Sequence, residues 1–401
     1  MNSEQFRLLG IESDYFAADG SFVRVPEEVL ASLAAILTAP GQPFFADFDE
    51  VFTIAPEMVS LISVGGVLSR CAAAYLLDEK GNSLPYSFVM MEGERIELPP
   101  LPAGYYTLEL HGAHQMRRCL VIVAPQRVYQ PEALRRGERL SGINVQLYSL
   151  RSAHNWGIGD LGDLRRLVAD FAADGIDFLG INPLHALFTT RPNWASPYSP
   201  SSRRWLNPIY IDVGGMPLFQ TSPSAQAWFS DAETQAILQR LREADWVDYA
   251  QVMALKMRAL RLIFHDFDAQ EMFADSREAF AEFLQRGGRD LRLFATFEAL
   301  DHYFYAQTAS IPFSEDSVGW LGWPEAYRYP DSAAVRAFAV SHEADIRFYM
   351  WLQWLMAEQL DILRLACHEA GMNLRLYGDL AVGVSRGGAD TWMHREMYCL
   401  Q

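Results

Sequence analysis

The segment from residue 143 to 184 constrains the fold most, because its pattern alternates between strand and helix. Residues 143–150 predict a strand, and residues 160–174 predict an amphipathic helix that ends at Gly175. Residues 177–184 are mostly apolar, as expected of a strand that is buried on both faces. A strand–helix–strand unit of this kind implies a parallel sheet with a right-handed crossover.

A third strand of this kind is predicted far along the chain, at residues 374–380, after a helix at residues 348–370 that carries an apolar stripe. The region between about 217 and 342 is mostly helical by its spacing, with segments at 225–244, 250–266, 276–286 and 289–307. We expect this insertion to lie over the carboxyl ends of the strands, where barrel loops build active sites.

The N-terminal part has a different character. Residues 1–43 predict a small helical segment, whose helix begins at Pro26 and carries acidic residues in its first turn. Residues 57–125 predict an immunoglobulin-like β-sandwich, because six short runs of strand formers are separated by turn signals. A connector at residues 125–139, with proline and charged residues, marks the best domain boundary. The third domain then runs over residues 140–401.

Two tyrosines in the predicted sandwich allow two interpretations. Tyr105 and Tyr106 could bind sugar if they are exposed, since aromatic rings are used in that way by some modules of this kind. The interpretation we favour is that the two side chains alternate between core and surface. The sandwich is then a spacer or a cover for the third domain.

Composition excludes several function classes. The formal net charge of −17 argues against nucleic acid as a partner, because phosphate contacts need clustered Lys and Arg. The four cysteines form no C-x-x-C pair, so we expect free thiols and no zinc site. The N-terminus lacks a signal-peptide pattern and no run of about twenty apolar residues occurs, which favours a cytoplasmic protein without a membrane span. The sequence does not bear on the oligomeric state.

A glycine-rich cluster, His154-Asn-Trp-Gly-Ile-Gly-Asp-Leu-Gly-Asp163, follows the first strand of the predicted parallel sheet. It lacks both G-x-G-x-x-G and a Walker lysine, so it does not predict a phosphate-binding loop. We expect Asp160 or Asp163 to cap the following helix or to lie in its first turn. A catalytic role for these aspartates is the less favoured alternative.

Two further clusters follow the second and third strands of this sheet. The loop from Ala195 to Asp212 combines aromatic rings with hydroxyl and amide groups between prolines, which is the mixture that sugars require, although an ordinary polar loop has the same composition. In Tyr377-Gly-Asp-Leu-Ala-Val-Gly-Val384, Asp379 falls at the end of its strand. A carboxylate at that position points into the mouth of a barrel.

Several blocks in the same order resemble the amylomaltases (4-α-glucanotransferases) of glycoside hydrolase family 77. They are the string N-W-G-I-G-D-L-G-D, the block S-P-Y-S-P-S-S-R-R-W-L-N-P-I-Y-I-D, the Y-G-D-L-A-V strand and the segment Phe348–Trp354. The chain is most similar to the bacterial maltodextrin-metabolism type, which carries an N-terminal extension like residues 1–130. The resemblance covers the whole chain and implies that its third domain is the first part of an α/β (β/α)8 TIM barrel.

The resemblance also implies a chemistry. The reaction would transfer an α-1,4-glucan segment from one maltodextrin to another, with retention through a covalent glycosyl-enzyme. By motif match, Tyr198 would stack on the sugar next to the cleaved bond, Ser196 would line the same subsite, and Asp379 would lie near it. The substrate would be a maltodextrin, with no metal or cofactor.

The family's nucleophile pattern, R-x-D-H, and its acid/base pattern, G-E-D-L-G, do not occur in the 401 residues. We therefore expect both catalytic carboxylates to lie beyond Gln401, in a longer enzyme, and the isolated chain to be inactive. One alternative is a non-catalytic maltodextrin-binding or scaffold protein built from the same parts. Another is a hydrolytic relative that uses water as the acceptor. The balance between transfer and hydrolysis depends on how the acceptor subsites exclude water.

Overall fold

A computed structural model of the chain describes residues 6, 11–17, 20–37, 50–63, 71–85, 90–91, 95–112, 116–308 and 318–398. The chain divides into two compact units, residues 1–129 and residues 130–401. Among the described residues, no helix is long and apolar enough to cross a membrane.

Two sheets of the first unit share one core. All six strands predicted between residues 57 and 125 are present. An additional strand, β3, was not predicted and pairs in parallel with β9. One sheet has the order β3 (Glu50–Ile54), β9 (Met116–Val123), β8 (Gly104–Gly112), β5 (Cys71–Leu77), and the other has the order β4 (Ser60–Ser63), β7 (Arg95–Leu98), β6 (Met90–Met91).

The core of this unit takes alternate side chains from both sheets. Leu108 and Leu110 of β8 are buried, as are Ile96 and Leu98 of β7, and all four belong to one apolar cluster. The same alternation separates the two tyrosines at the start of β8. Tyr106 is buried and its hydroxyl donates to the Pro102 carbonyl at 3.0 Å, whereas the Tyr105 side chain is exposed. The predicted alternation between core and surface is therefore confirmed.

The segment before these sheets contains the predicted helix, α2 (Glu27–Leu37), directly after Pro26. Leu30 and Ala34, one turn apart, are buried on one face of this helix, and Leu33 is exposed. A two-stranded hairpin, β1 (Asp14–Phe16) and β2 (Phe22–Arg24), was not predicted. The segment is therefore not purely helical.

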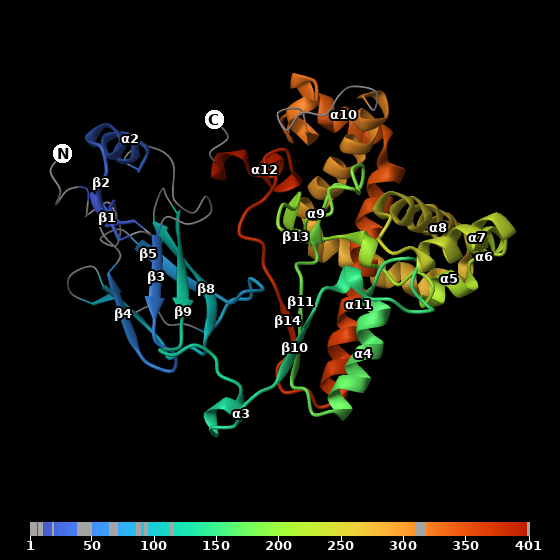
Figure 1. Cartoon of the computed structure of the whole chain (residues 1–401). Helices are drawn as coiled ribbons and strands as arrows, with labels where there is room; N and C mark the ends of the chain where they lie inside the picture. Colours follow the sequence, from blue (N-terminus) through green and yellow to red (C-terminus); the bar gives the residue numbers. More distant parts are fainter. Residues whose placement is uncertain are drawn as a thin grey trace. The chain divides into compact units, whose positions relative to one another are not determined.

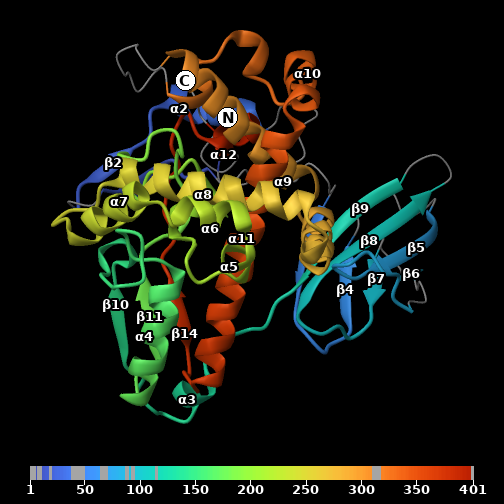
Figure 2. The same ribbon diagram turned by 90° about the vertical axis from the view of Figure 1, so that its right-hand side faces the viewer.

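The second unit is built on a parallel sheet of three strands, β10 (Gly142–Val145), β11 (Phe178–Ile181) and β14 (Arg375–Gly378), with β11 in the centre. The helices α4 (Leu161–Ala173) and α11 (Glu343–Glu369) lie side by side on one face of this sheet (Figures 1 and 2). The predicted strand–helix–strand unit and the third strand are confirmed. The short helix α3 (Glu132–Arg135) precedes β10.

The first strand is shorter than predicted, because the chain turns after Val145. Residues 147–149 form a 3₁₀ turn, in which the Leu147 amide donates to Asn182 Oδ1 at 2.8 Å instead of to a neighbouring strand. The Ser149 hydroxyl donates to the Gln146 carbonyl at 2.7 Å and closes the same turn. Such side-chain bonds compete with the strand ladder and end it.

The region between β13 (Ser202–Leu206) and α11 is mostly helical, as predicted. Its helices are α5 (Pro217–Thr221), α6 (Pro223–Phe229), α7 (Ala232–Glu243), α8 (Tyr249–Ala269), α9 (Ala274–Thr308) and α10 (Ala333–Ser341). Gly288 interrupts the geometry of α9 with a φ of 51°, a conformation that favours glycine, near the predicted break between residues 286 and 289. Figures 1 and 2 show these helices beyond the carboxyl ends of the three parallel strands.

Candidate functional site

A cleft opens at the carboxyl ends of the three parallel strands. Its volume is about 260 Å³, and every strand contributes to its wall. The lining residues are Asn144, Val145, Gln146, Gly180, Ile181, Asn182, Tyr198, Tyr377 and Asp379. In parallel α/β sheets this edge is where ligands bind, because several loops converge there.

Tyr198 and Asp379 meet in this cleft. Asp379 follows β14 directly, and its amide donates to the Ile181 carbonyl at 3.1 Å, which extends the pairing with β11 by one residue. The Tyr198 hydroxyl donates to Asp379 Oδ2 at 3.1 Å, and this hydrogen bond is the largest cause that raises the pKa of Tyr198. Half of the Tyr198 surface stays exposed (54%), so its ring can still receive a ligand.

Ser196 lies in the same loop but does not reach the cleft. It is exposed, and its carbonyl accepts the Ser199 amide at 3.4 Å in a turn. The residues that line the cleft include Tyr198 and Asp379 but not Ser196. The structure thus brings together two of the three predicted site residues.

The loop that carries Tyr198 is bounded by a hairpin, β12 (His185–Ala186) and β13 (Ser202–Leu206). Residues 202–206 were expected to be loop and are instead a strand, because they pair across a bulge with β12. Ser201 then fastens the loop to α12 (Ala389–Met393), since its side-chain and carbonyl oxygens accept the Ala389 and Asp390 amides at 3.0 and 3.1 Å. The two loops that supply Tyr198 and Asp379 are thereby joined.

Four polar lining residues were not predicted: Asn144, Gln146, Asn182 and Tyr377. Each lies at or just beyond the end of a parallel strand, so the rule that singled out Asp379 applies to them as well. Gly180 makes room for one of them, because a Cβ at this position would overlap the side-chain oxygen of Asn144. Asn182 fixes the strand ends by accepting the Leu147 amide and donating to the Pro183 carbonyl.

The aspartates of the glycine-rich cluster cap α4, as predicted. Asp160 is the N-cap, its side chain accepts the amides of Gly162 and Asp163, and the Asp163 side chain accepts the Asp160 amide in return. Lys256 of α8 is buried beside them, with Nζ 3.6 Å from Asp160 Oδ2. Burial raises the pKa of Asp160 to about 7 and lowers that of Lys256. These groups are structural, because they are enclosed in the core and away from the cleft.

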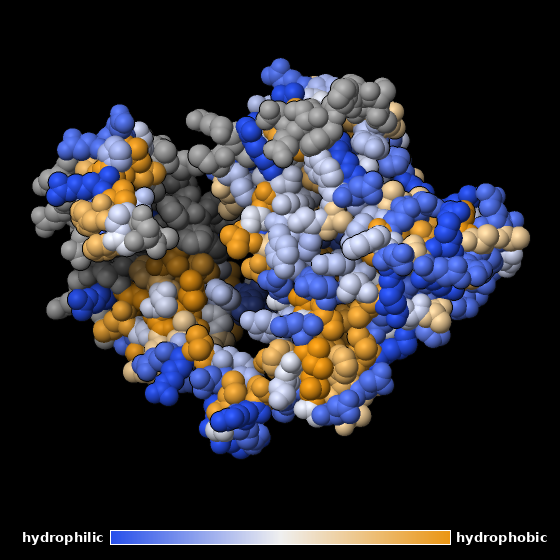
Figure 3. Space-filling model, viewed as in Figure 1, coloured by the Kyte–Doolittle hydropathy of each residue, from blue (hydrophilic) through white to orange (hydrophobic). Residues whose placement is uncertain are grey.

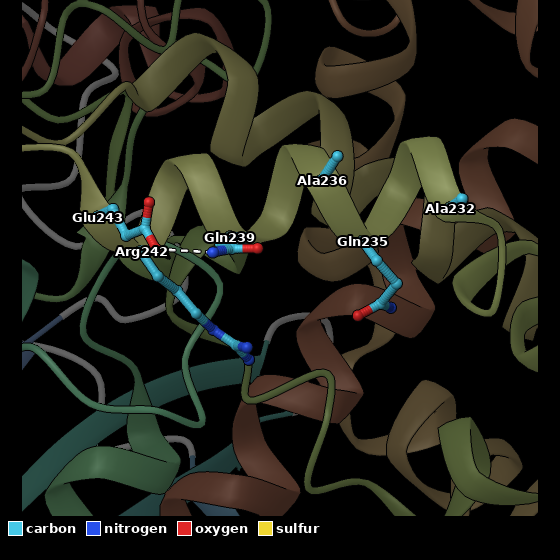
Figure 4. A pocket seen from close by; sticks show the side chains of 6 residues that line it. All are labelled: Ala232, Gln235, Ala236, Gln239, Arg242 and Glu243. Atoms are coloured by element: carbon cyan, nitrogen blue, oxygen red, sulfur yellow. Dashed lines mark hydrogen bonds between the residues drawn. The ribbon is translucent and has the colours of Figure 1, made fainter.

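A second depression lies beside α7 and is lined by this helix alone (Figure 4). Gln239 donates to Glu243 Oε1 at 2.8 Å along the helix. Arg242 is used structurally, since its Nε donates to the Asn155 carbonyl at 2.7 Å and ties α7 to the glycine-rich cluster. One helix offers no converging groups, so this depression is not a candidate site. No cluster of three or more His, Cys, Asp or Glu side chains that could hold a metal occurs in the described part of the chain.

Comparison with known proteins identifies relatives over most of the chain. The glycoside hydrolase family 77 model, described as 4-alpha-glucanotransferase, matches residues 145–401. A 4-alpha-glucanotransferase of Haemophilus influenzae is 37% identical over 396 residues, which are 98% of this chain and 56% of the relative. One of Mycobacterium tuberculosis is 36% identical over 307 residues, 73% of this chain and 39% of the relative.

Two solved structures of amylomaltases are similar to this chain in fold. Amylomaltase from Corynebacterium glutamicum superposes with a TM-score of 0.71 at 26% identity, over 97% of this chain and 56% of that one. Amylomaltase from Streptococcus agalactiae in complex with acarbose, at 20% identity and a TM-score of 0.50, shares the fold over 66% of this chain and 48% of that one. The chain thus spans about half the length of the curated relatives it matches.

Proposed function

Because this chain belongs to glycoside hydrolase family 77, the 4-alpha-glucanotransferases, we propose that its cleft holds an α-1,4-glucan during glucan transfer. The pairing of Tyr198 with Asp379 carries this proposal, since it places an exposed aromatic ring beside a carboxylate. A glucose unit has an apolar face that stacks on such a ring and rim hydroxyls that donate to such oxygens. The amides of Asn144, Gln146 and Asn182 add donors and acceptors around the same space.

The proposed reaction moves a segment of one maltodextrin to another with retention of configuration. A retaining mechanism uses two carboxyl groups about 5–5.5 Å apart, one as nucleophile and one as acid/base. Asp379 is the one carboxylate among the residues that line the cleft. We therefore assign Asp379 and Tyr198 to substrate binding, keep Ser196 as a proposed neighbour of the subsite, and expect no bond cleavage by these 401 residues alone.

We also propose that the parallel sheet is the first part of a (β/α)8 barrel and that the two sheets of the first unit form an immunoglobulin-like sandwich. The parallel order β10, β11, β14, with helices between the strands, supports the barrel. Exposed apolar side chains on the outer helix α11, Ile362 and Leu365, support it as well. Figure 3 shows apolar residues gathered near the lower part of α11. The parallel pairing of β3 with β9 and the shared core support the sandwich. A cytoplasmic location stays a prediction.

Calorimetric titration of the 401-residue chain with maltoheptaose tests the function. We expect saturable binding that Tyr198→Ala weakens by tenfold or more, because a stacked aromatic side chain contributes about 1.5–3 kcal/mol. Tyr105→Ala is the matched control, since Tyr105 has nearly the same exposed fraction (57%) and lies in the other unit. If Tyr105→Ala abolishes binding and Tyr198→Ala leaves it intact, the proposed site is wrong.

A further inference from the structure

The imidazole of His185 is buried in β12 and contacts the segment that follows Asp379. Its Nε2 accepts the backbone amide of Ala381 at 3.2 Å, although the two residues are 196 positions apart. Ala381 is itself buried and stands two residues after Asp379. The ring therefore holds the segment that continues from the carboxylate of the cleft.

The same bond fixes where the neutral ring carries its proton. Because Nε2 accepts the Ala381 amide, its lone pair is in use, and the proton of the neutral imidazole lies on Nδ1. The backbone of Arg203 also interacts with the ring and acts to raise its pKa. The bond to Ala381 therefore requires one tautomer of the neutral ring.

Arg203 holds the same segment with its side chain. Its guanidinium donates to the Val382 carbonyl at 2.9 Å and to the Ala381 carbonyl at 3.4 Å. Its own amide donates to Asp390 Oδ2 at 2.9 Å, which anchors β13 to α12. Residues 381–382 are thus bound at an amide by His185 and at two carbonyls by Arg203.

We propose that His185 is a positioning residue for Asp379, whose neutral ring holds the Ala381 amide and releases it on protonation. A protonated ring carries N–H at Nε2, and two N–H groups then face each other where one hydrogen bond had been. The consequence is a pH-dependent cleft, with Asp379 held in place at neutral pH and freed in acid. This inference rests on the proposed function for its meaning, but the release itself is independent of any glucan.

The charges around the ring favour the neutral form. Burial is the largest cause that lowers the pKa of His185, followed by the positive charge of Arg203 from β13. The carboxylates of Asp390 in α12 and Asp379 after β14 act in the opposite direction, and the net direction is down. When the Ala381 amide is released, His185 has the ordinary pKa of a histidine. The hydrogen bond between them is therefore fully formed above a pH of about 6.5 and weakens as the pH falls below that value.

Hydrogen exchange of the 401-residue chain without glucan, followed by mass spectrometry at pH 8 and pH 5, tests this inference. After correction for intrinsic rates, peptides over residues 379–385 should lose protection at pH 5 by about fivefold or more, which is the worth of one net hydrogen bond. Peptides from α4 (161–173) should keep theirs, which excludes general acid unfolding.

Two variants sharpen the test. His185→Gln keeps an acceptor that does not titrate, so its protection should be the same at both pH values. His185→Phe removes the acceptor and should expose the segment at pH 8 as well. If that variant does not fold, the comparison of the wild type with His185→Gln at the two pH values still tests the inference. Equal protection of the wild type at both pH values, or acid loss in His185→Gln, would overturn the inference. Failure of maltoheptaose to bind would instead count against the proposed function and leave the exchange result standing.

Discussion

The hydroxyl of Tyr198 donates a 3.1 Å hydrogen bond to Asp379 Oδ2, joining two residues that are 181 positions apart. Tyr198→Phe removes this bond and keeps the ring. Because the pair is exposed, we expect the dissociation constant for maltoheptaose to rise only about threefold, near the lower end of the range for a net hydrogen bond. Calorimetric titration measures it. A loss as large as that of Tyr198→Ala would show that the hydroxyl, and not the ring, dominates binding.

Asp379→Asn keeps the shape of the side chain and removes its charge. A hydrogen bond to a charged group contributes about 1.5–3 kcal/mol, so we expect maltoheptaose affinity to fall by roughly tenfold to a hundredfold. The midpoint of thermal unfolding should stay within about a degree of the wild type, because this side chain lies at the exposed rim. An unchanged affinity would remove Asp379 from the site.

Lys256 is enclosed in the core, where Nζ donates to the carbonyls of Ile209 and Ile211 at 2.7 and 2.8 Å beside Asp160. Lys256→Met leaves these two carbonyls without their donor and the buried Asp160 carboxylate without its cation. We expect the free energy of unfolding to drop by about 3–5 kcal/mol in urea denaturation. Arg364→Met, which breaks an exposed ion pair with Asp361, should cost about 0–1 kcal/mol. Equal effects of the two substitutions would contradict the assigned role.

Glu298 of α9 is buried and accepts the Thr189 hydroxyl at 2.8 Å, and burial raises its pKa to about 8. The native state thus keeps a proton that the unfolded chain releases near pH 4.5, so this group stabilises the fold in acid and loses that contribution between pH 4.5 and 8. Glu298→Gln removes the titration. Between pH 4.5 and 9, the free energy of unfolding of the variant should rise by up to about 5 kcal/mol relative to that of the wild type.

Urea denaturation across this pH range measures the gain. The control is Glu282→Gln, an exposed glutamate on the same helix, which should leave the pH dependence of the wild type unchanged. A Glu298→Gln profile parallel to that of the wild type would mean that Glu298 is ionised in the native protein.

Incubation of the 401-residue chain with maltotriose tests the assignment of Asp379 to binding and not to chemistry. We expect neither glucose nor longer dextrins above the level of a buffer blank, because the cleft offers one carboxylate where retention requires two. Chromatography of the products measures this. Transfer products that disappear in Asp379→Asn would give Asp379 a catalytic role instead.

The sequence predicted the features that depend on local patterns. The caps at Asp160 and Asp163 follow from residues three positions apart, and the three parallel strands follow from short apolar runs. Asp379 and Tyr198 were found because strand ends and a family motif mark them. Their hydrogen bond was not predicted, since it depends on where two distant loops meet.

Two of the missed strands, β3 and β13, depend on their pairing with other parts of the chain. β3 is a strand because it pairs with β9, some seventy residues later in the chain. β13 pairs with β12 across a bulge, which the local periodicity of the sequence does not indicate. Ser196 is exposed in a turn of the loop and is not among the residues that line the cleft, although it lies two positions from Tyr198. Tertiary contacts determine these positions, and such contacts cannot be predicted from the local patterns of a single sequence.

The claim that the cleft at the strand ends binds glucan is tested most directly by a crystal structure of the chain with maltotetraose. We predict a glucose ring stacked on Tyr198, with a hydroxyl within hydrogen-bond distance of Asp379 Oδ1 or Oδ2. Sugar density elsewhere on the molecule, with the cleft between Tyr198 and Asp379 empty at saturating maltotetraose, would contradict the account.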